Sequence, residues 1–377
     1  MNIWAPSVKH QGQELHAVMI FIHGGSYDSG GSSAAYYDGT DLVQNHDVIV
    51  VTLNYRLNVF GFPNSPDIDP SKQNLGLLDQ RLAIEWVHQN IAKFGGDPNR
   101  ILLFGQSAGA ASVDIYSYAY PDDPLVSALA LESGTAPLLT TAPDHQNWNG
   151  LSIALGCGVG DKSFKCMSQV PMMKIVEARA KGVYTFFPIV DDVLVFSDYS
   201  ARAKSGKLAR LPTLAGINER EVTALLPLSL TSVDDTAIYK TTQRVYNCPL
   251  RDSVRIRLSQ NVPIWRYLYH GNFSNLSPTP WLGAYHGSEV PLIFGNYNMS
   301  TVTPSSKEVE ASRYMQGGWV AFANNPRTGL STYGWPRFNF DELTLINLAL
   351  NNTTPAIFTF ASSWDNDCDS LIARSEL

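Results

Sequence analysis

The stretch Arg100–Val113, RILLFGQSAGAASV, joins an apolar run to a segment of small residues through a single serine. The apolar run is typical of a buried strand, and the alanine-rich segment favours a helix. At the corner between them, Ser107 has Gly105 and Gly109 two positions away on either side. A strand that turns into a helix within about two residues forces the corner residue into a strained backbone conformation. The sequence therefore predicts a tight turn that lifts the Ser107 hydroxyl out of a sheet.

Ser107 has two interpretations. Serine is a common N-cap residue, so it can simply begin the helix. The strand-turn-helix context favours a nucleophile instead, because the helix N-terminus behind the hydroxyl stabilises developing negative charge. A neutral serine is a poor nucleophile, and it also needs a base, an orienting acid and an oxyanion site.

The rest of the chain alternates between strand and helix patterns. Leu75, Leu78, Leu82 and Trp86 recur at near-helical spacing, and several short apolar runs indicate strands. The predicted strands are residues 17–22, 47–55, 100–104, 127–133, 211–218 and 262–270, and the predicted helices are 74–96 and 308–324. We expect residues 142–182, a helix-and-loop pattern, to cap the sheet. Strands separated by helices predict a mostly parallel sheet in one α/β domain over residues 1–377.

Composition excludes several classes of protein. Of the 377 residues, 44% are hydrophobic and 16% are charged, which is enough apolar material for a sizeable core. The net charge of −7 argues against nucleic-acid binding, because phosphates would not be neutralised. The sequence has no run of 18 or more apolar residues, so we expect no membrane span. It also has no CxxC pair or histidine–cysteine cluster that would indicate zinc.

Cysteines and glycosylation sequons bear on the compartment. Cys157 and Cys166 close a short loop, which indicates either a disulfide or two buried thiols. Five Asn-x-Ser/Thr sequons favour a secreted protein, and their asparagines are Asn272, Asn275, Asn298, Asn351 and Asn352. Residues 1–25 nevertheless lack the basic segment and apolar core of a signal peptide. The chain is therefore either cytosolic or a form without its original N-terminus.

A glycine-rich loop follows the first strong strand. Residues 21–31 read FIHGGSYDSGG. Such a loop can be an ordinary turn. The run Gly24-Gly25-Ser26 is better explained if small residues let a substrate oxygen approach backbone N–H groups.

Three longer stretches, together with these motifs, resemble one known family. They are LNYRLNVFGF at residues 53–62, the block at residues 74–113, and AYHGSEVPLIFG at residues 284–295. The chain resembles the type-B carboxylesterase, cholinesterase and fungal lipase family of α/β-hydrolases, and is most similar to fungal secreted carboxylesterases. The resemblance runs from MNIWAP at the start to the helix around Trp319. It implies an α/β-hydrolase fold, with a mostly parallel central sheet flanked by helices.

The resemblance also assigns roles. Ser107 matches the nucleophile, and Ala108 after it supplies one oxyanion N–H. The upstream donors should be Gly25 and Ser26, although the family usually has a third glycine in place of Ser26. A backbone N–H is available from any residue except proline, so this departure preserves the donor. The residue before the nucleophile is often glutamate in the family and is Gln106 here, so a buried charge beside the site is missing.

The acid and base lie in the second half of the chain. The family pattern Gly-x-Asn-x-x-Glu matches residues 216–221 and favours Glu221 as the acid, with Glu219 as a nearby alternative. The motif GAYHGSEVPLIFG places the base at His286. The order Ser107, Glu221, His286 is that of α/β-hydrolases.

The resemblance implies ester hydrolysis through an acyl-enzyme. His286 would take the proton of Ser107 as it attacks an ester carbonyl, and Glu221 would hold the imidazole. Three backbone N–H groups would receive the oxyanion. The reaction requires no metal or organic cofactor, and the expected partner is a small-molecule ester rather than nucleic acid or a membrane.

Three alternatives stay open at this point. A cholinesterase needs aromatic rings for a quaternary ammonium, but Ala224 and Leu225 stand at the corresponding positions. A lipase specificity is less favoured because no lid is recognisable. A non-catalytic adhesion or scaffold protein of this family typically lacks the nucleophile, whereas Ser107 and His286 are present. We therefore expect a general carboxylesterase.

Two further expectations come from the resemblance. It implies a Cys157–Cys166 disulfide, and gives weaker support to a Cys248–Cys368 bridge. Family members also have an N-terminal region before MNIWAP and a longer segment before the histidine, whereas only 65 positions (286 − 221) separate Glu221 from His286. We therefore expect a chain that lacks N-terminal strands, is shortened between residues 222 and 248, and is secreted in its full-length form.

Overall fold

The computed structural model describes residues 1–7 and 14–373. Within them, one nine-stranded sheet has the order β1-β3-β2-β4-β5-β6-β7-β8-β9, with β1 and β9 antiparallel at its edges and the strands between them parallel. The strands are β1 (Asn2–Trp4), β2 (His16–Ile22), β3 (Ile49–Leu53), β4 (Gly96–Gln106), β5 (Ala128–Glu132), β6 (Thr213–Asn218), β7 (Ile264–Tyr269), β8 (Leu343–Leu348) and β9 (Ile357–Phe360). The predicted mostly parallel α/β sheet is confirmed.

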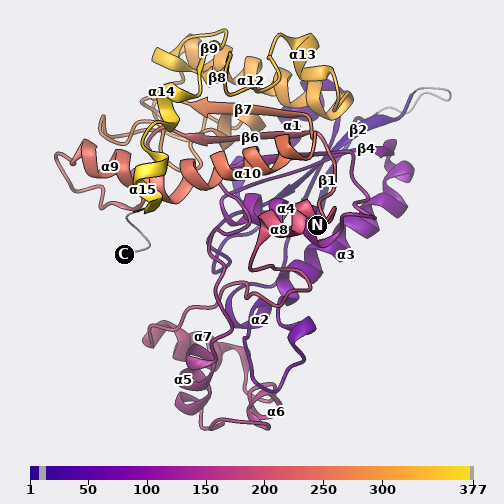
Figure 1. The fold of residues 1–377 in the computed structure, drawn as a ribbon, viewed down its shortest axis with the longest axis vertical. Helices are drawn as coiled ribbons and strands as arrows, with labels where there is room; N and C mark the ends of the chain where they lie inside the picture. Colours follow the sequence, from indigo (N-terminus) through magenta and orange to yellow (C-terminus); the bar gives the residue numbers. More distant parts are fainter. Residues whose placement is uncertain (8–13, 374–377) are drawn as a thin grey trace.

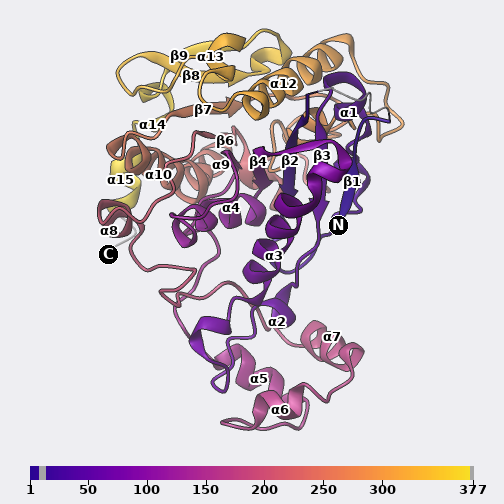
Figure 2. The ribbon, with the colours of Figure 1, turned by 90° about the vertical axis from the view of Figure 1, so that its right-hand side faces the viewer.

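Helices cover both faces of this sheet, with α12 and α13 on one side and α3 and α4 on the other (Figures 1 and 2). The α-helices are α1 (Thr40–His46), α2 (Asn58–Gly61), α3 (Leu75–Asn90), α4 (Ala108–Ala119), α5 (Gln146–Ala154), α6 (Ser163–Met167), α7 (Met172–Lys181), α8 (Tyr199–Lys204), α9 (Asp235–Thr242), α10 (Cys248–Ser259), α11 (Val290–Phe294), α12 (Ser306–Asn324), α13 (Gly329–Tyr333), α14 (Ser362–Asp365) and α15 (Cys368–Ala373). Short 3₁₀ segments are η1 (Ala35–Tyr37), η2 (Pro70–Lys72), η3 (Ile91–Phe94), η4 (Glu221–Leu225) and η6 (Leu350–Asn352), and η5 (Gln243–Asn247) is a π-helix.

The alternation of side chains along β2 produces two cores. Val18, Ile20 and Ile22 belong to the apolar cluster shared with α3, α4 and α10. Met19 and Phe21 point the other way and join the cluster shared with α11 and α12. Both sets are fully buried, as expected for a parallel strand covered on both faces. The long apolar runs of the sequence are therefore strands buried on two sides.

Helix α3 forms where predicted, but its buried face differs from the one that the leucine spacing suggests. Leu82 is 65% exposed and Trp86 is 39% exposed. The buried positions are instead Leu77, Ile84 and Val87, which pack on the sheet. Apolar residues lie on both faces of α3. The spacing of the leucines therefore predicted the helix correctly but not the face that packs on the sheet.

Helices α5, α6 and α7 form a lobe that projects away from the sheet, so the expectation that residues 142–182 cap the sheet is wrong (Figures 1 and 2). The Cys157–Cys166 disulfide closes a loop within this lobe, as the resemblance implied. Arg179 of α7 forms an ion pair with Asp28, which lies in the glycine-rich loop after β2. An apolar cavity of about 410 Å³ separates the lobe from α2 and α3 and is lined in part by Phe60 and Trp148.

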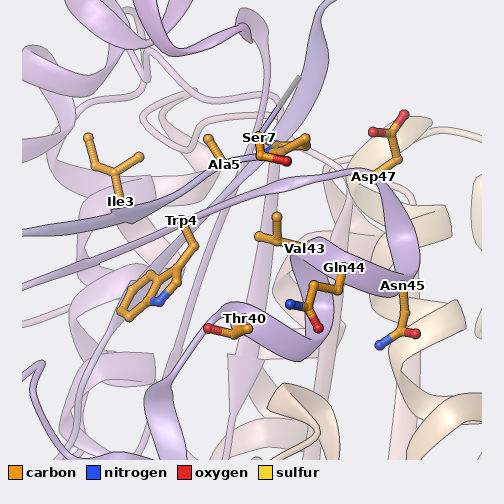
Figure 3. A pocket seen from close by; sticks show the side chains of 10 residues that line it. Ile3, Trp4, Ala5, Ser7, Thr40, Val43, Gln44, Asn45 and Asp47 are labelled. Carbon is orange, nitrogen blue, oxygen red and sulfur yellow. The ribbon is translucent and has the colours of Figure 1, made fainter. Parts of the chain in front are cut away.

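A second cavity of about 680 Å³ lies at the β1 edge of the sheet, beside α1 (Figure 3). Trp4 and Val43 line it, together with Asp47, whose carboxylate is 3.1 Å from His16 Nδ1. None of the predicted site residues lines this cavity. Among the described residues, every helix is too short or too polar to span a bilayer.

Candidate active site

Ser107 occupies the corner between β4 and α4 with φ 59° and ψ −123°, a conformation that L-residues rarely adopt. Its N–H donates to Glu132 O at 2.8 Å, which ties the corner to the end of β5. A Cβ on Gly109 would lie 1.9 Å from Ile22 O, and one on Gly105 would lie 2.7 Å from Gly109 C. Neither position has room for a side chain. The two glycines are therefore needed because β2, β4 and α4 meet at the turn.

The glycine-rich loop after β2 lies directly against this corner. A Cβ on Gly24 would be 2.9 Å from Ser107 Cβ and 2.8 Å from Gln106 O. Gly25 and Ser26 both have positive φ, at 104° and 56°. Ala108 is the first residue of α4, so its N–H has no acceptor within the helix. The predicted oxyanion donors Gly25, Ser26 and Ala108 thus come from segments that meet at Ser107.

Aromatic packing holds the base of that loop. The Tyr55 hydroxyl donates to His23 O at 2.9 Å, and the two rings stack with centroids 4.6 Å apart. His23 Nδ1 lies 2.8 Å from Gly24 O. Burial lowers the pKa of His23 despite that contact, so the ring stays neutral at neutral pH. His23 and Tyr55 therefore fix the loop and add no charge to it.

The structure brings Glu221 and His286 together. Glu221 Oε2 lies 2.5 Å from His286 Nδ1, and the His286 N–H donates to Glu221 O at 3.2 Å. The other carboxylate oxygen accepts the Asn218 N–H at 2.7 Å, and the Glu221 side chain is completely buried. Glu219 points elsewhere, with Oε2 3.2 Å from His270 Nδ1. Of the two alternatives left open by the sequence, only Glu221 faces His286.

Gln106, the residue before Ser107, contacts the second nitrogen of the imidazole. Gln106 Nε2 lies 3.1 Å from His286 Nε2. Because an amide NH₂ only donates, this contact assigns the lone pair to Nε2 and the proton to Nδ1, where Glu221 accepts it. The tautomer is the one that a general base next to Ser107 requires. Among the described residues, His286 Nε2 therefore accepts a hydrogen bond from Gln106 rather than from the Ser107 hydroxyl.

Electrostatics raise the pKa of His286. Burial by itself would lower it, because a buried cation loses hydration. The charge and hydrogen bond of Glu221, with a further contribution from the charge of Glu289, outweigh that effect. The site therefore favours the imidazolium that forms when Ser107 gives up its proton.

Two more buried carboxyl groups lie behind the triad, and sequence reasoning missed both. Glu289 contacts Asn218 Nδ2, and burial followed by the charge of Glu221 raises the pKa of Glu289 to about 7. Glu132 accepts the Trp319 indole N–H at 2.7 Å, and burial followed by the charge of Glu289 raises its pKa well above the usual range. Glu289 stands within the quoted histidine motif, whereas no local signal marks Glu132.

Tyr246 is a third residue, after Glu289 and Glu132, that the sequence did not reveal. Its ring centroid lies 5.0 Å from that of His286, with the planes inclined by 45°. Tyr246 belongs to the π-helix η5, which ends at Asn247, and the next residue, Cys248, is joined to Cys368. The weakly supported second disulfide is thus present in the structure, next to the site.

Within the described residues, no group of three His, Cys, Asp or Glu side chains is arranged to hold a metal ion. The site combines a strained serine, an imidazole bonded to a buried carboxylate, and clustered backbone N–H groups. The sequence matches the model of the carboxylesterase family over residues 1–241 and 229–363. The chain belongs to the carboxylesterase family.

Proteins similar in sequence to this chain agree with its assignment to the carboxylesterase family. Chlorogenic acid esterase of Aspergillus niger is 39% identical over 387 residues, which span 100% of this chain and 73% of the relative. Secreted lipase 5 of Gibberella zeae is 36% identical over 396 residues, or 95% of this chain and 74% of the relative. Acetylcholinesterase-1 of Trittame loki is 29% identical over 426 residues, or 93% and 75%. The predicted α/β-hydrolase fold and carboxylic ester hydrolase function are confirmed, and the alternative functions are not favoured.

Proposed function

We propose that this carboxylesterase hydrolyses small-molecule esters with Ser107 as nucleophile, His286 as general base and Glu221 as the acid that orients it. The observation that carries the proposal is the 2.5 Å contact between Glu221 Oε2 and His286 Nδ1. This contact fixes the imidazole with its lone pair toward the side of the site where Gln106 and Ser107 stand.

The reaction begins with proton transfer. His286 Nε2 exchanges its contact with Gln106 for the Ser107 hydroxyl and accepts that proton as Oγ bonds to the ester carbonyl carbon. The carbonyl oxygen becomes an oxyanion, which the N–H groups of Gly25, Ser26 and Ala108 receive. Each donor is worth roughly 3–4 kcal/mol in other hydrolases. Negative charge at this point is also favoured by the N-terminus of α4.

Collapse of this intermediate breaks the ester C–O bond. The alkoxide leaves with the proton held on His286 Nε2, and the acyl group stays on Ser107 Oγ. Water then gives a proton to His286, attacks the acyl carbon, and releases the acid as the proton returns to Ser107. Atoms and charges balance without a cofactor.

The residues near the acid bear on which esters the enzyme accepts. We propose a general esterase with no choline specificity. Ala224 and Leu225 are exposed, and Leu225 is 75% accessible, so these positions offer no aromatic ring for a quaternary ammonium. Relatives named for chlorogenic acid, lipid and acetylcholine esters define the panel against which this specificity is measured.

We also propose that the protein is secreted and that residues 1–377 form one domain, shortened between residues 222 and 248. Two disulfides within the described residues favour an oxidising compartment. A relative carries the name secreted lipase.

The test is hydrolysis of p-nitrophenyl butyrate by the purified chain, beside Ser107→Ala. We expect turnover by the parent protein and a loss of at least about 10³-fold in kcat in the variant, at unchanged melting temperature. Chlorogenic acid, p-nitrophenyl palmitate and acetylthiocholine complete the panel. A folded parent protein that hydrolyses none of these esters would contradict the proposal, as would a Ser107→Ala protein with parental activity.

A further inference from the structure

Tyr246 is the aromatic side chain that faces the catalytic imidazole, and it reaches this place through unusual backbone. The 5.0 Å centroid separation brings the ring within the range of a cation–π contact. Tyr246 lies on η5, a π-helical turn inserted between α9 and α10. Such turns are rare and occur frequently at functional sites.

A buried network holds this turn from behind. Asn247 Nδ2 donates to Gln243 Oε1 at 2.7 Å and to Asp365 Oδ1 at 3.0 Å. Arg266 of β7 donates to Asn247 Oδ1 at 2.8 Å and to both Asp365 oxygens, at 2.6 and 2.7 Å. All of these side chains are at least nine-tenths buried. The turn is thus fixed to the sheet and to the C-terminal segment.

The Cys248–Cys368 disulfide adds a covalent link at the same point. It joins the first residue of α10 to the first residue of α15 across 120 positions of sequence. Figure 1 shows α15 beside the start of α10. Because a packed hydrogen-bond network and a disulfide converge on the residues next to Tyr246, its ring has little freedom to leave His286.

The groups around His286 explain what an aromatic ring would add. Glu221 of η4 bonds Nδ1, Glu289 at the N-cap of α11 adds a nearby charge, and Gln106 contacts Nε2. Tyr246 packs against the imidazole ring, where it can stabilise positive charge through its π face. Burial and the charge of Glu221 raise the pKa of Tyr246, so the ring is a neutral phenol.

We propose that Tyr246 is a positioning residue of the triad, which confines the His286 imidazole and stabilises its protonated form. The inference rests on the proposed function and deepens it. Both effects act when Ser107 transfers its proton to His286, so they belong to kcat rather than to substrate binding. The disulfide and the Asn247–Asp365–Arg266 network are the means by which the fold holds Tyr246 in place.

The test compares two substitutions of Tyr246 with one of its neighbour. Tyr246→Phe keeps the ring, whereas Tyr246→Leu keeps apolar bulk over the imidazole and removes the π face. Val245→Ala, on the same turn and 36% exposed, controls for disturbance of η5. Melting temperatures establish that all four proteins fold.

The first readout needs no activity. The pKa of His286 is measured by NMR on protein labelled with ¹⁵N-histidine, with His286→Gln to assign the signal. Because a π face favours the imidazolium, we expect Tyr246→Leu to lower this pKa by about half a unit, and Tyr246→Phe and Val245→Ala to keep it near the parent value. An unchanged or higher pKa in Tyr246→Leu would overturn the proposal, even if the parent protein hydrolysed no ester.

The second readout is kinetic. With p-nitrophenyl butyrate we expect Tyr246→Leu to lower kcat about 3- to 10-fold, with little change in KM. The acid limb of its pH profile should move to lower pH, following the pKa. A higher KM at parental kcat would overturn the positioning role, because Tyr246 would then contact substrate instead. An equal loss in Tyr246→Phe would also overturn it, because the hydroxyl rather than the ring would be responsible.

Discussion

The two sides of the active site are held in different ways. Ser107 is fixed by backbone: one strained residue, two neighbouring glycines and a third glycine, Gly24, that touches it. His286 is fixed by side chains that come from η4, η5 and the N-cap of α11. The turn that carries the nucleophile is therefore built from consecutive residues that pack against the Gly24 loop, whereas the base side is assembled from the side chains of separate segments.

This difference indicates where each side is vulnerable. On the nucleophile side, an added methyl group has no space, so small substitutions should have large effects. On the base side, contacts are individually replaceable but depend on the fold that brings them together. Substitutions on the two sides separate these two modes.

Glu221→Gln should have the largest effect, because it removes the charge that pairs with the imidazolium and disturbs its tautomer. We expect kcat/KM to fall about 10³- to 10⁴-fold, as for the acid of other triads. Glu219→Gln is the matched control, since Glu219 faces His270 rather than His286. Steady-state kinetics on both variants decide the assignment, and a greater loss in Glu219→Gln would reverse it.

The two disulfides should differ in their contribution to stability. The Cys248–Cys368 bond spans 120 positions and the Cys157–Cys166 bond spans 9. In the chain-entropy description, replacing the first pair by alanines costs about 5 kcal/mol and the second about 3 kcal/mol in the free energy of unfolding. Urea denaturation of both double variants measures this.

The same pair of variants also tests what each disulfide holds. Loss of Cys248–Cys368 should lower kcat, because η5 is released next to His286. Loss of Cys157–Cys166, in the projecting lobe, should leave kcat of the folded protein nearly unchanged. Equal effects of the two pairs on kcat would argue against a disulfide that supports the base side.

Gly24→Ala should impair the nucleophile side while the fold survives. Its Cβ would lie 2.9 Å from Ser107 Cβ, so the loop that carries Gly25 and Ser26 must shift. A loop displaced from the oxyanion loses about 10²- to 10³-fold in kcat. Gly31→Ala is the control in the same loop, because its Cβ would meet only Asn54 Oδ1 at 3.6 Å. Kinetics that show comparable losses in both variants would refute the contact argument.

The smallest effect concerns pH. Because the pKa of His286 is raised above 6.5 and the base must be unprotonated, kcat/KM should fall as pH drops through a limb above 6.5. Glu289→Gln removes a charge that favours the proton on His286, so the limb should move to lower pH by less than about one unit. Glu310→Gln, an exposed residue of α12, is the control. A shift to higher pH in Glu289→Gln would contradict the electrostatic account.

The surroundings of Ser107 could be predicted from the sequence more completely than those of His286. The Ser107 turn could be predicted because its strand, glycines and helix are consecutive residues. The strands β2 to β7 could be predicted because parallel strands are apolar on both faces. In contrast, β9 is a short edge strand with partly exposed residues, and neither it nor β8 was anticipated.

The base side was harder to predict. Spacing alone left Glu219 and Glu221 as alternatives, because two carboxylates in one loop differ only in the direction that each side chain takes. Tyr246 carries no local signal. Its position depends on Asp365 and Cys368, more than a hundred residues away, and on a π-helical turn that no periodicity indicates.

Covalent labelling tests most directly whether Ser107 is the activated nucleophile. The parent protein, His286→Gln and Ser107→Ala are treated with a fluorophosphonate and digested, and the peptides are identified by mass spectrometry. We predict stoichiometric modification of Ser107 in the parent, strongly slowed modification in His286→Gln and none in Ser107→Ala. Modification of another serine, or no modification of the folded parent protein, would contradict the account.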